Sequence, residues 1–424
     1  MLSQEVEERL AEHLTARIEE ANSYILKKIG EAIKQISTLT PSQAYQIGQI
    51  LKYGGTYNEI AKELARVSGK NVQDIYKIFE EVAKNNKQFA KQFYKYRGID
   101  YIPYSKDVAL QNMVRSIGDI TAQTYINISR TRGIGFLFEG LDGQLRFKNI
   151  QESYYEIIDR GILSISQGKE TFQTEMRRIM KQLGNNGVVL YESGRTRRLD
   201  SAIRMNILDG IRQVSNETSK RFGEEYGSNM VEVSHHTNSA PDHIDTVDGK
   251  QFARIDVIRQ QIASGIEKEI KLEDIQGTKV KVKGKWYDDY DTINNSLDRK
   301  VSTLNCRHYP FEGILGVSKP SYTKEQIEAD KKKNLDGFDF EGKHYTLYEG
   351  SQLCRRVELE IRKAKDTQIL ARASGDDELV LQSQGRITKL TNKYREILKA
   401  SGLPSQLQRA SVSGYRRVAK SKLQ

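Results

Sequence analysis

Four of the six histidines in this 424-residue chain fall between positions 235 and 308, where an even spread would place about one. They stand in two separate strings, together with a cysteine and several carboxylates. The first string holds His235, His236 and His243, and the second holds Cys306 and His308. Because imidazole, thiolate and carboxylate groups are the ligands of tetrahedral zinc sites, the pattern indicates a candidate metal site.

The candidate ligands are His243, Cys306, His308 and one of the adjacent pair His235 and His236, with His235 taken as the fourth. A bound zinc ion would join the two strings into one folded unit. No Cys-x-x-Cys pair is present, so the spacing matches no strong zinc signature. The alternative, which the weak spacing favours, is a hydrogen-bonded network in which His243 and Cys306 pack and satisfy backbone groups.

Two catalytic interpretations compete with these. Asp242-His243-Ile244 resembles the first string of an HNH-type nuclease, with Asn294 or Asn295 as its middle residue and a metal that activates water. The gap of about 50 residues is longer than that compact motif uses, and its usual cysteine pairs are absent. Cys306 could also act as a nucleophile with His243 as its base, but one cysteine and one histidine prove nothing without geometry. We therefore predict that the protein is not an enzyme, and keep an HNH-like nuclease as the alternative.

The net charge of +11 points to an anionic partner, for which nucleic acid is the usual candidate. Guanidinium groups suit phosphate contacts, and arginines gather at two places. The candidate nucleic-acid contacts are Arg195, Arg197, Arg198 and Arg204 around one helix start, and Arg416 and Arg417 in the basic tail. The alternative is a solvated helix start, paired with Glu192 and Asp200, and a charge that serves solubility.

Long runs of helical periodicity and only six prolines predict a mainly α fold with a small α+β core around the His/Cys strings. The expected helices include 1–39, a second from Thr40-Pro41 to Gly54, a third from Thr56 to Val67, and a fourth from Asn71. Residues 133–143 are expected to form a turn region, and 150–183 two helices separated at Gly161 or Gly168. The predicted domains are a helical arm (1–98), a helical linking domain (99–190), the α+β core (191–317) and a helical C-terminal segment (318–424).

The cellular compartment is predicted from the absence of sequence signals for membrane insertion, secretion and disulfide bonding. No apolar run approaches the roughly 18 residues of a membrane span, and the N-terminus has no secretory pattern. Cys306 and Cys354 cannot make a disulfide framework, which fits a reducing compartment. We therefore expect no membrane association and a cytoplasm as the place of synthesis.

Four strings, in this order and at this spacing, resemble the phage minor capsid protein 2 family, which is related to the Mu-type head morphogenesis proteins. The matching strings are Tyr191–Gly194 through Ala202-Ile203-Arg204, Val233-Ser234-His235 through Pro241-Asp242-His243 to Gly249–Phe252, Asn305-Cys306-Arg307-His308 with Tyr309-Pro310-Phe311, and Tyr345–Gln352 with Arg355-Arg356. The family usually has an arginine before the proline of the second string, where this chain has Ala240. It also has a Trp or Leu-Gln before the glycine, where this chain has Val247-Asp248.

The resemblance implies a low-copy virion protein that enters the procapsid with the portal protein and has a structural role at the portal vertex of the phage head. It implies the portal protein as a partner, capsid or scaffold proteins as others, and non-specific contact with viral DNA. The protein would be made in the bacterial host cytoplasm and reside in the virion. Residues 1–98 would then be the arm that binds a partner.

Overall fold

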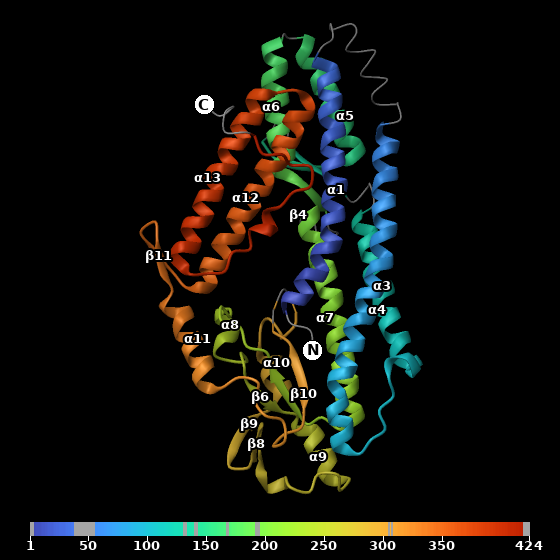
Figure 1. The fold of residues 1–424 in the computed structure, drawn as a ribbon, viewed down its shortest axis with the longest axis vertical. Coiled ribbons are helices and arrows are strands. Elements are labelled where there is room, and N and C mark those ends of the chain that lie inside the picture. The colour runs from blue at the N-terminus through green and yellow to red at the C-terminus, as the bar shows by residue number, and fades with distance from the viewer. Residues whose placement is uncertain are drawn as a thin grey trace. The chain divides into compact units, whose positions relative to one another are not determined.

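The computed structural model describes residues 4–37, 56–129, 134–139, 143–166, 169–190, 196–303, 306 and 308–418. Most of them are helical and the strands are short, which confirms the predicted mainly α class with small mixed regions (Figure 1). The chain forms two compact units. Unit 1 comprises Met1–Arg9, Tyr76–Ile120 and Leu208–Ser351, and unit 2 comprises Leu10–Ile75, Thr121–Ile207 and Gln352–Gln424. The predicted division into four consecutive domains stays a prediction.

The N-terminal helices form as their apolar spacing predicts. Helix α1 (Gln4–Ser37) buries one stripe of residues three, four or seven positions apart, which identifies the face that packs inward. The buried stripe consists of Leu14, Ile18, Ala21, Ile25, Leu26, Ile29, Ile33 and Ile36. The second expected helix, from Thr40 to Gly54, lies outside the described residues.

The prediction of separate third and fourth helices is wrong, because α3 is a single helix from Thr56 to Arg97. No proline interrupts this stretch. Asn71, expected to open a helix, is instead buried inside one. Its side-chain amide donates to the carbonyl oxygen of Leu14 at 3.1 Å and to the hydroxyl of Tyr125. A polar residue that looks like a helix cap in the sequence thus serves as a buried link between helices.

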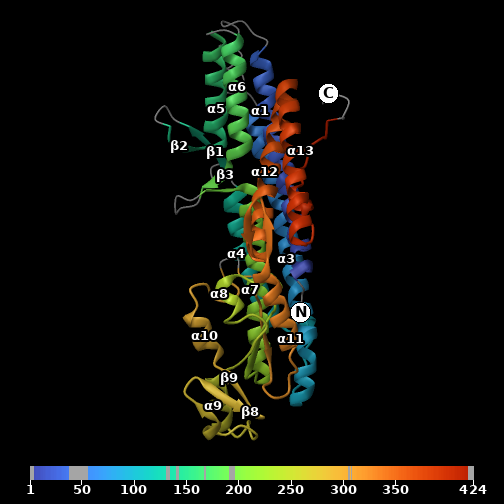
Figure 2. The ribbon, with the colours of Figure 1, turned by 90° about the vertical axis from the view of Figure 1, so that its left-hand side faces the viewer.

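Unit 2 also contains a four-stranded antiparallel sheet in the order β2-β1-β3-β4. Strand β1 falls inside the expected turn region, so that prediction is wrong; Phe136 and Phe138 alternate toward the interior as a half-buried strand requires. Helix α5 continues through Gly161, which excludes this residue as the helix break, and Gly168, the other expected position, lies outside the described residues. Figure 2 shows β1 and β2 beside α5 and α6. The bounds are β1 (Ile134–Glu139), β2 (Leu145–Asn149), α5 (Ile150–Ser166), α6 (Lys169–Asn186), β3 (Gly187–Leu190) and β4 (Thr196–Arg198).

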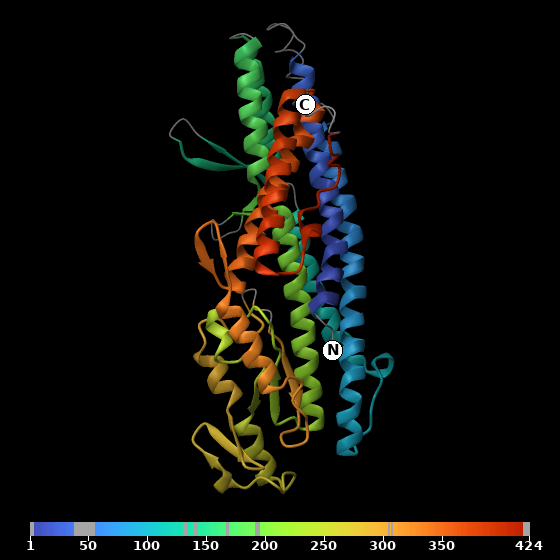
Figure 3. The same ribbon diagram turned by 60° about the vertical axis from the view of Figure 1, so that its left-hand side comes forward.

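The C-terminal part of unit 2 is a helical hairpin. Helices α12 (Leu347–Ser374) and α13 (Asp377–Ser401) are joined by a turn at Gly375, whose φ of 78° favours glycine, and they lie side by side (Figure 3). Asp376 caps α13 by accepting from the Leu379 amide at 3.0 Å. Gly402 ends α13 in a left-handed conformation, as glycine does at many helix C-termini.

Unit 1 carries the mixed region. Helices α4 (Val108–Ser129) and α7 (Leu199–Tyr226), each shared with unit 2, accompany two three-stranded antiparallel sheets, in the orders β10-β5-β6 and β7-β8-β9. The remaining bounds are β5 (Met230–Val233), α8 (Pro241–Ile244), β6 (Gln251–Ala253), α9 (Ile255–Ala263), β7 (Ile275–Gln276), β8 (Lys279–Val282), β9 (Lys285–Asp288), α10 (Tyr290–Ser296), β10 (Pro310–Gly313), α11 (Lys324–Asp336), β11 (Phe338–Phe340) and β12 (Lys343–Tyr345). Within the described ranges, no helix combines the length and the apolar character that crossing a membrane demands.

Candidate metal centre

The sheet β10-β5-β6 brings the two His/Cys strings to one place. Strands β5 and β10 pair with Val233 opposite Pro310, and the backbone ladder continues because Ser234 donates its amide to the carbonyl oxygen of Tyr309 at 2.9 Å. The residues just after His308 therefore lie beside the residues just before His235. Pro241 opens the short helix α8 at its first turn, where a proline is well tolerated, and α8 turns His243 back toward the second string.

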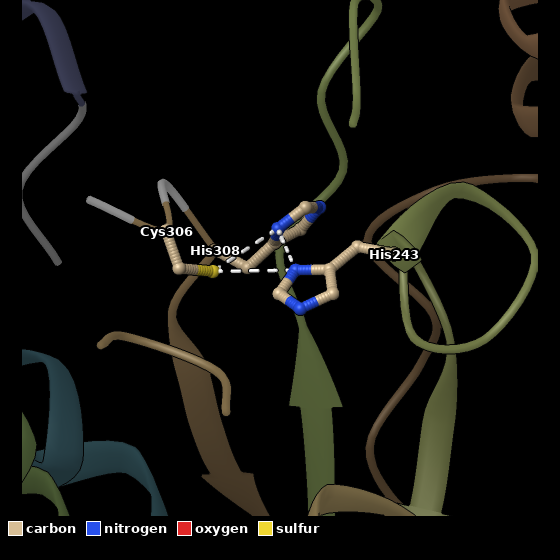
Figure 4. A group of neighbouring side chains, drawn as sticks. All are labelled: His243, Cys306 and His308. Atoms are coloured by element: carbon tan, nitrogen blue, oxygen red, sulfur yellow. Dashed lines mark hydrogen bonds between the residues drawn. The ribbon is translucent and has the colours of Figure 1, made fainter. Parts of the chain in front are cut away.

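Three side chains meet there: His243, Cys306 and His308 (Figure 4). The Cys306 sulfur lies 3.4 Å from Nδ1 of His243 and 3.5 Å from Nδ1 of His308, and the two Nδ1 atoms are 3.2 Å apart. All three side chains are buried, with at most 3% of any residue exposed. Two nitrogens and one sulfur thus face a single point inside the protein.

The outer nitrogens of both imidazoles are held by acceptors. Nε2 of His243 donates to the carbonyl oxygen of Arg299 at 2.6 Å, and Nε2 of His308 lies 2.8 Å from Oδ1 of Asp248. A proton on each Nε2 leaves the Nδ1 lone pairs directed at the shared point. Metal-bound histidines are oriented by the same kind of partner, either a backbone carbonyl or a carboxylate.

His235, expected as the fourth ligand, is not part of this group. Its Nδ1 lies 2.8 Å from Oδ2 of Asp248, and its Nε2 lies 2.9 Å from Oδ2 of Asp330 on α11, so both ring nitrogens face carboxylates. His236 also lies outside the group, with Nε2 3.2 Å from the hydroxyl of Ser234. The structure brings together three of the four predicted ligands and places His235 in the surrounding hydrogen-bond network.

The local electrostatics favour an ionised thiol. Burial opposes ionisation of Cys306, but hydrogen bonds with His243 and His308 outweigh it and lower the pKa of the thiol. The pKa of His308 is raised, against its burial, by Asp248 and by Cys306. Burial also opposes ionisation of Asp248, yet His235 and His308 lower its pKa to about 2. Because the thiolate is the form of cysteine that binds metals, the donor set fits a cation such as zinc.

The nuclease interpretation requires residues that are engaged elsewhere. Asp242 forms a bidentate ion pair with Arg299, at 2.6 and 2.9 Å, and lies 3.7 Å from the outer Nε2 of His243 rather than from the Nδ1 that faces the cluster. Asn294 accepts from the Val301 amide, and Asn295 accepts from the Lys300 ammonium group, both at 2.9 Å. These asparagines stabilise the loop before Cys306, which gives them a structural role.

Comparison with known families agrees with the strings around this site. The family described as Phage minor capsid protein 2 matches residues 8–399 of the chain. The chain belongs to the phage minor capsid protein 2 family. No curated protein and no solved structure matches it. Membership gives this minor capsid protein a structural role in a phage, alongside other phage structural proteins.

The arginines predicted to contact nucleic acid fall in different environments in this minor capsid protein. Arg197, Arg416 and Arg417 are exposed, whereas Arg204 is half-buried and Arg195 lies outside the described residues. The Arg198 side chain is only 11% exposed and pairs with the buried Asp366 at 2.9 Å. That pairing gives Arg198 a structural role.

In the sequence, Asp248 stands out only as a departure from the family strings, and no pattern points to Arg299 or Asp330. Arg299 acts through its backbone carbonyl, which no side-chain pattern reveals. Asp330 lies in a lysine-rich helix far along the chain and has no local signal. The adjacent string Gly249–Phe252 matches the family, whereas Asp248 itself departs from it.

Proposed function

We propose that this minor capsid protein works at the portal vertex of the phage head, where it contacts the portal protein and the packaged DNA. The family match over residues 8–399 carries the proposal, because it includes the N-terminal helices as well as the His/Cys strings. The protein would be made in the bacterial host cytoplasm and carried into the virion. Capsid or scaffold proteins are further candidate partners.

The helices within residues 1–98 are the proposed partner-binding arm. Helix α3 is long and amphipathic, and its exposed, charged side is the surface that we propose contacts the partner. The test is co-sedimentation of the purified full chain with portal oligomers. Recovery with the portal fraction is expected, and sedimentation as a separate species at every protein ratio would refute the portal assignment.

Non-specific DNA contact is supported by the net charge of +11 and by the exposed arginines of the tail. Binding to a phosphate backbone releases counterions, so affinity should fall steeply as salt rises. The double variant Arg416→Ala with Arg417→Ala is expected to weaken binding and to reduce the salt dependence. The control is Arg66→Ala, because Arg66 is already paired with Glu63 at 2.6 Å. Equal binding by both variants would rule out the tail as the contact.

The HNH-like nuclease remains the alternative from a different class. It predicts nicking of DNA in the presence of Mg²⁺, Mn²⁺ or Zn²⁺ that is lost in His243→Ala. We expect no nicking, because the imidazole of His243 is held between the Arg299 carbonyl and the Cys306 thiol.

A further inference from the structure

We infer that His243, Cys306 and His308 are the protein ligands of a bound zinc ion. The ligand atoms are Nδ1 of each histidine and the cysteine sulfur, all within 4.8 Å of one another. This inference goes beyond the proposed portal role and does not depend on it. It also replaces His235 in the ligand set expected from the sequence.

The strongest argument comes from counting protons. The carbonyl oxygen of Arg299 can only accept, so Nε2 of His243 carries a proton. The ionised carboxylate of Asp248 can likewise only accept from Nε2 of His308. With both rings in the neutral form that a metal ligand takes, both Nδ1 atoms are acceptors that face each other at 3.2 Å.

Two acceptors in contact inside a protein need something positive between them. A proton can bridge one pair of these three atoms, and that is the hydrogen-bonded alternative. A metal ion interacts with both nitrogens and the sulfur at once. The convergence of all three atoms, rather than of one pair, favours the metal.

The donor types select the metal. Magnesium and calcium prefer oxygen ligands, whereas imidazole and thiolate together suit zinc. Three ligand groups meet among the residues that the structure describes, one fewer than closed structural zinc sites use. Both imidazoles have oriented outer nitrogens, which is the usual arrangement around a bound metal.

The ion would join two parts of unit 1 that are distant in the sequence. His243 lies on α8 after β5, and the other two ligands lie just before β10. The metal would therefore close the long loop that contains β6, the sheet β7-β8-β9 and α10. Because the unfolded chain has no preformed site, metal binding would add directly to the stability of this unit.

The test uses the full chain and exploits its two buried cysteines, Cys306 and Cys354. Zinc content of the protein purified without chelators is measured first, and stoichiometric zinc is expected. Cobalt is then titrated into the chelator-treated protein, because a Co²⁺–thiolate bond gives a charge-transfer absorption band. We expect the band in the wild type and in the Cys354→Ser control, and its loss in Cys306→Ser.

Zinc-edge X-ray absorption of the wild type provides a readout that needs no variant, should Cys306→Ser fail to fold. One sulfur and two imidazole nitrogens are expected in the first coordination shell. The inference is overturned if purified protein holds no stoichiometric zinc and shows no cobalt–thiolate band. It is equally overturned if the band persists in Cys306→Ser, or if absorption finds only oxygen ligands.

Discussion

The carboxylate of Asp248 connects His235 and His308, which lie in different strings of the chain. Oδ2 is 2.8 Å from Nδ1 of His235, and Oδ1 is 2.8 Å from Nε2 of His308. Oδ1 also accepts from the backbone amide of His236 at 2.9 Å. With only 2% of the residue exposed, this one carboxylate satisfies three donors in the interior of unit 1.

Replacing Asp248 by asparagine is expected to destabilise the protein by about 3 kcal/mol, because an amide cannot accept from all three donors and leaves buried groups unsatisfied. The measurement is urea unfolding in the presence of a chelator, so that metal binding does not contribute. Asp245→Asn is the control, since Asp245 is exposed and its ion pair with Lys331 should contribute less than about 1 kcal/mol. Equal losses in the two variants would contradict the role of Asp248.

Asp107 predicts a pH-dependent contribution to stability. One oxygen accepts from the Leu110 amide at 3.0 Å and from Arg221 at 2.8 Å, and the other pairs with the buried Lys87 at 3.2 Å. Burial opposes ionisation, but these partners outweigh it and lower the pKa of Asp107. The folded state therefore favours the carboxylate, and its stabilisation is present above the unfolded pKa of about 3.9 and is lost as the pH falls below it.

Asp107→Asn should consequently cost about 3 kcal/mol at neutral pH, because it removes the nearer of the two carboxylates that balance the buried Lys87 and leaves Glu225 at 3.5 Å. Unfolding curves at pH 7, 5 and 3 measure the difference from wild type. The difference in the free energy of unfolding between wild type and variant should be similar at pH 7 and pH 5 and smaller at pH 3. A stability difference that is constant across this pH range would show that Asp107 contributes through packing alone.

The environment of Glu358 predicts a pH dependence of stability opposite to that of Asp107. Burial raises the pKa of this carboxyl group, whose oxygen accepts from the Tyr394 hydroxyl at 3.0 Å. Ionisation is therefore disfavoured in the folded state and lowers stability as the pH rises through the folded pKa. Glu358→Gln keeps the acceptor and removes the charge, so we expect it to be more stable than wild type at pH 8. The advantage should disappear near pH 4 in thermal unfolding.

Two glycines of unit 2 provide a matched pair of tests. A Cβ atom on Gly184 of α6 would clash with Oγ1 of Thr367 and would lie 2.8 Å from the backbone nitrogen of Thr367 on α12. Gly184→Ala should therefore cost about 1–3 kcal/mol by forcing these helices apart. Gly385→Ala on α13 meets nothing within 4 Å and should gain up to about 1 kcal/mol from helix propensity. Chemical denaturation of both variants compares them directly, and a tolerated alanine at 184 would exclude the close approach.

The elements with strong periodicity could be predicted from the sequence, and the errors have specific causes. The buried stripe of α1 follows from its apolar spacing. The break expected between Val67 and Asn71 was wrong because local capping signals cannot show that Asn71 is satisfied by Leu14 and Tyr125. Tertiary contacts decided the outcome there.

The same distinction holds at the candidate site. Residue type alone singled out His243, Cys306 and His308, because these side chains are rare in the chain and clustered. It could not separate His235 from the ligands, since that choice depends on Asp248 and on Asp330, a residue of the distant helix α11. Side-chain chemistry was thus visible in the sequence, whereas the orienting partners required the fold.

The interleaving of the two units constrains how the protein can be made. A ribosome releases the chain from its N-terminus, and helix α1 emerges long before α12 and α13, with which it shares unit 2. Unit 1 likewise waits for the stretch that ends at Ser351. During translation the apolar stripes of the early helices are left without their final neighbours, so newly made chains are expected to depend on chaperones or on prompt capture by an assembly partner.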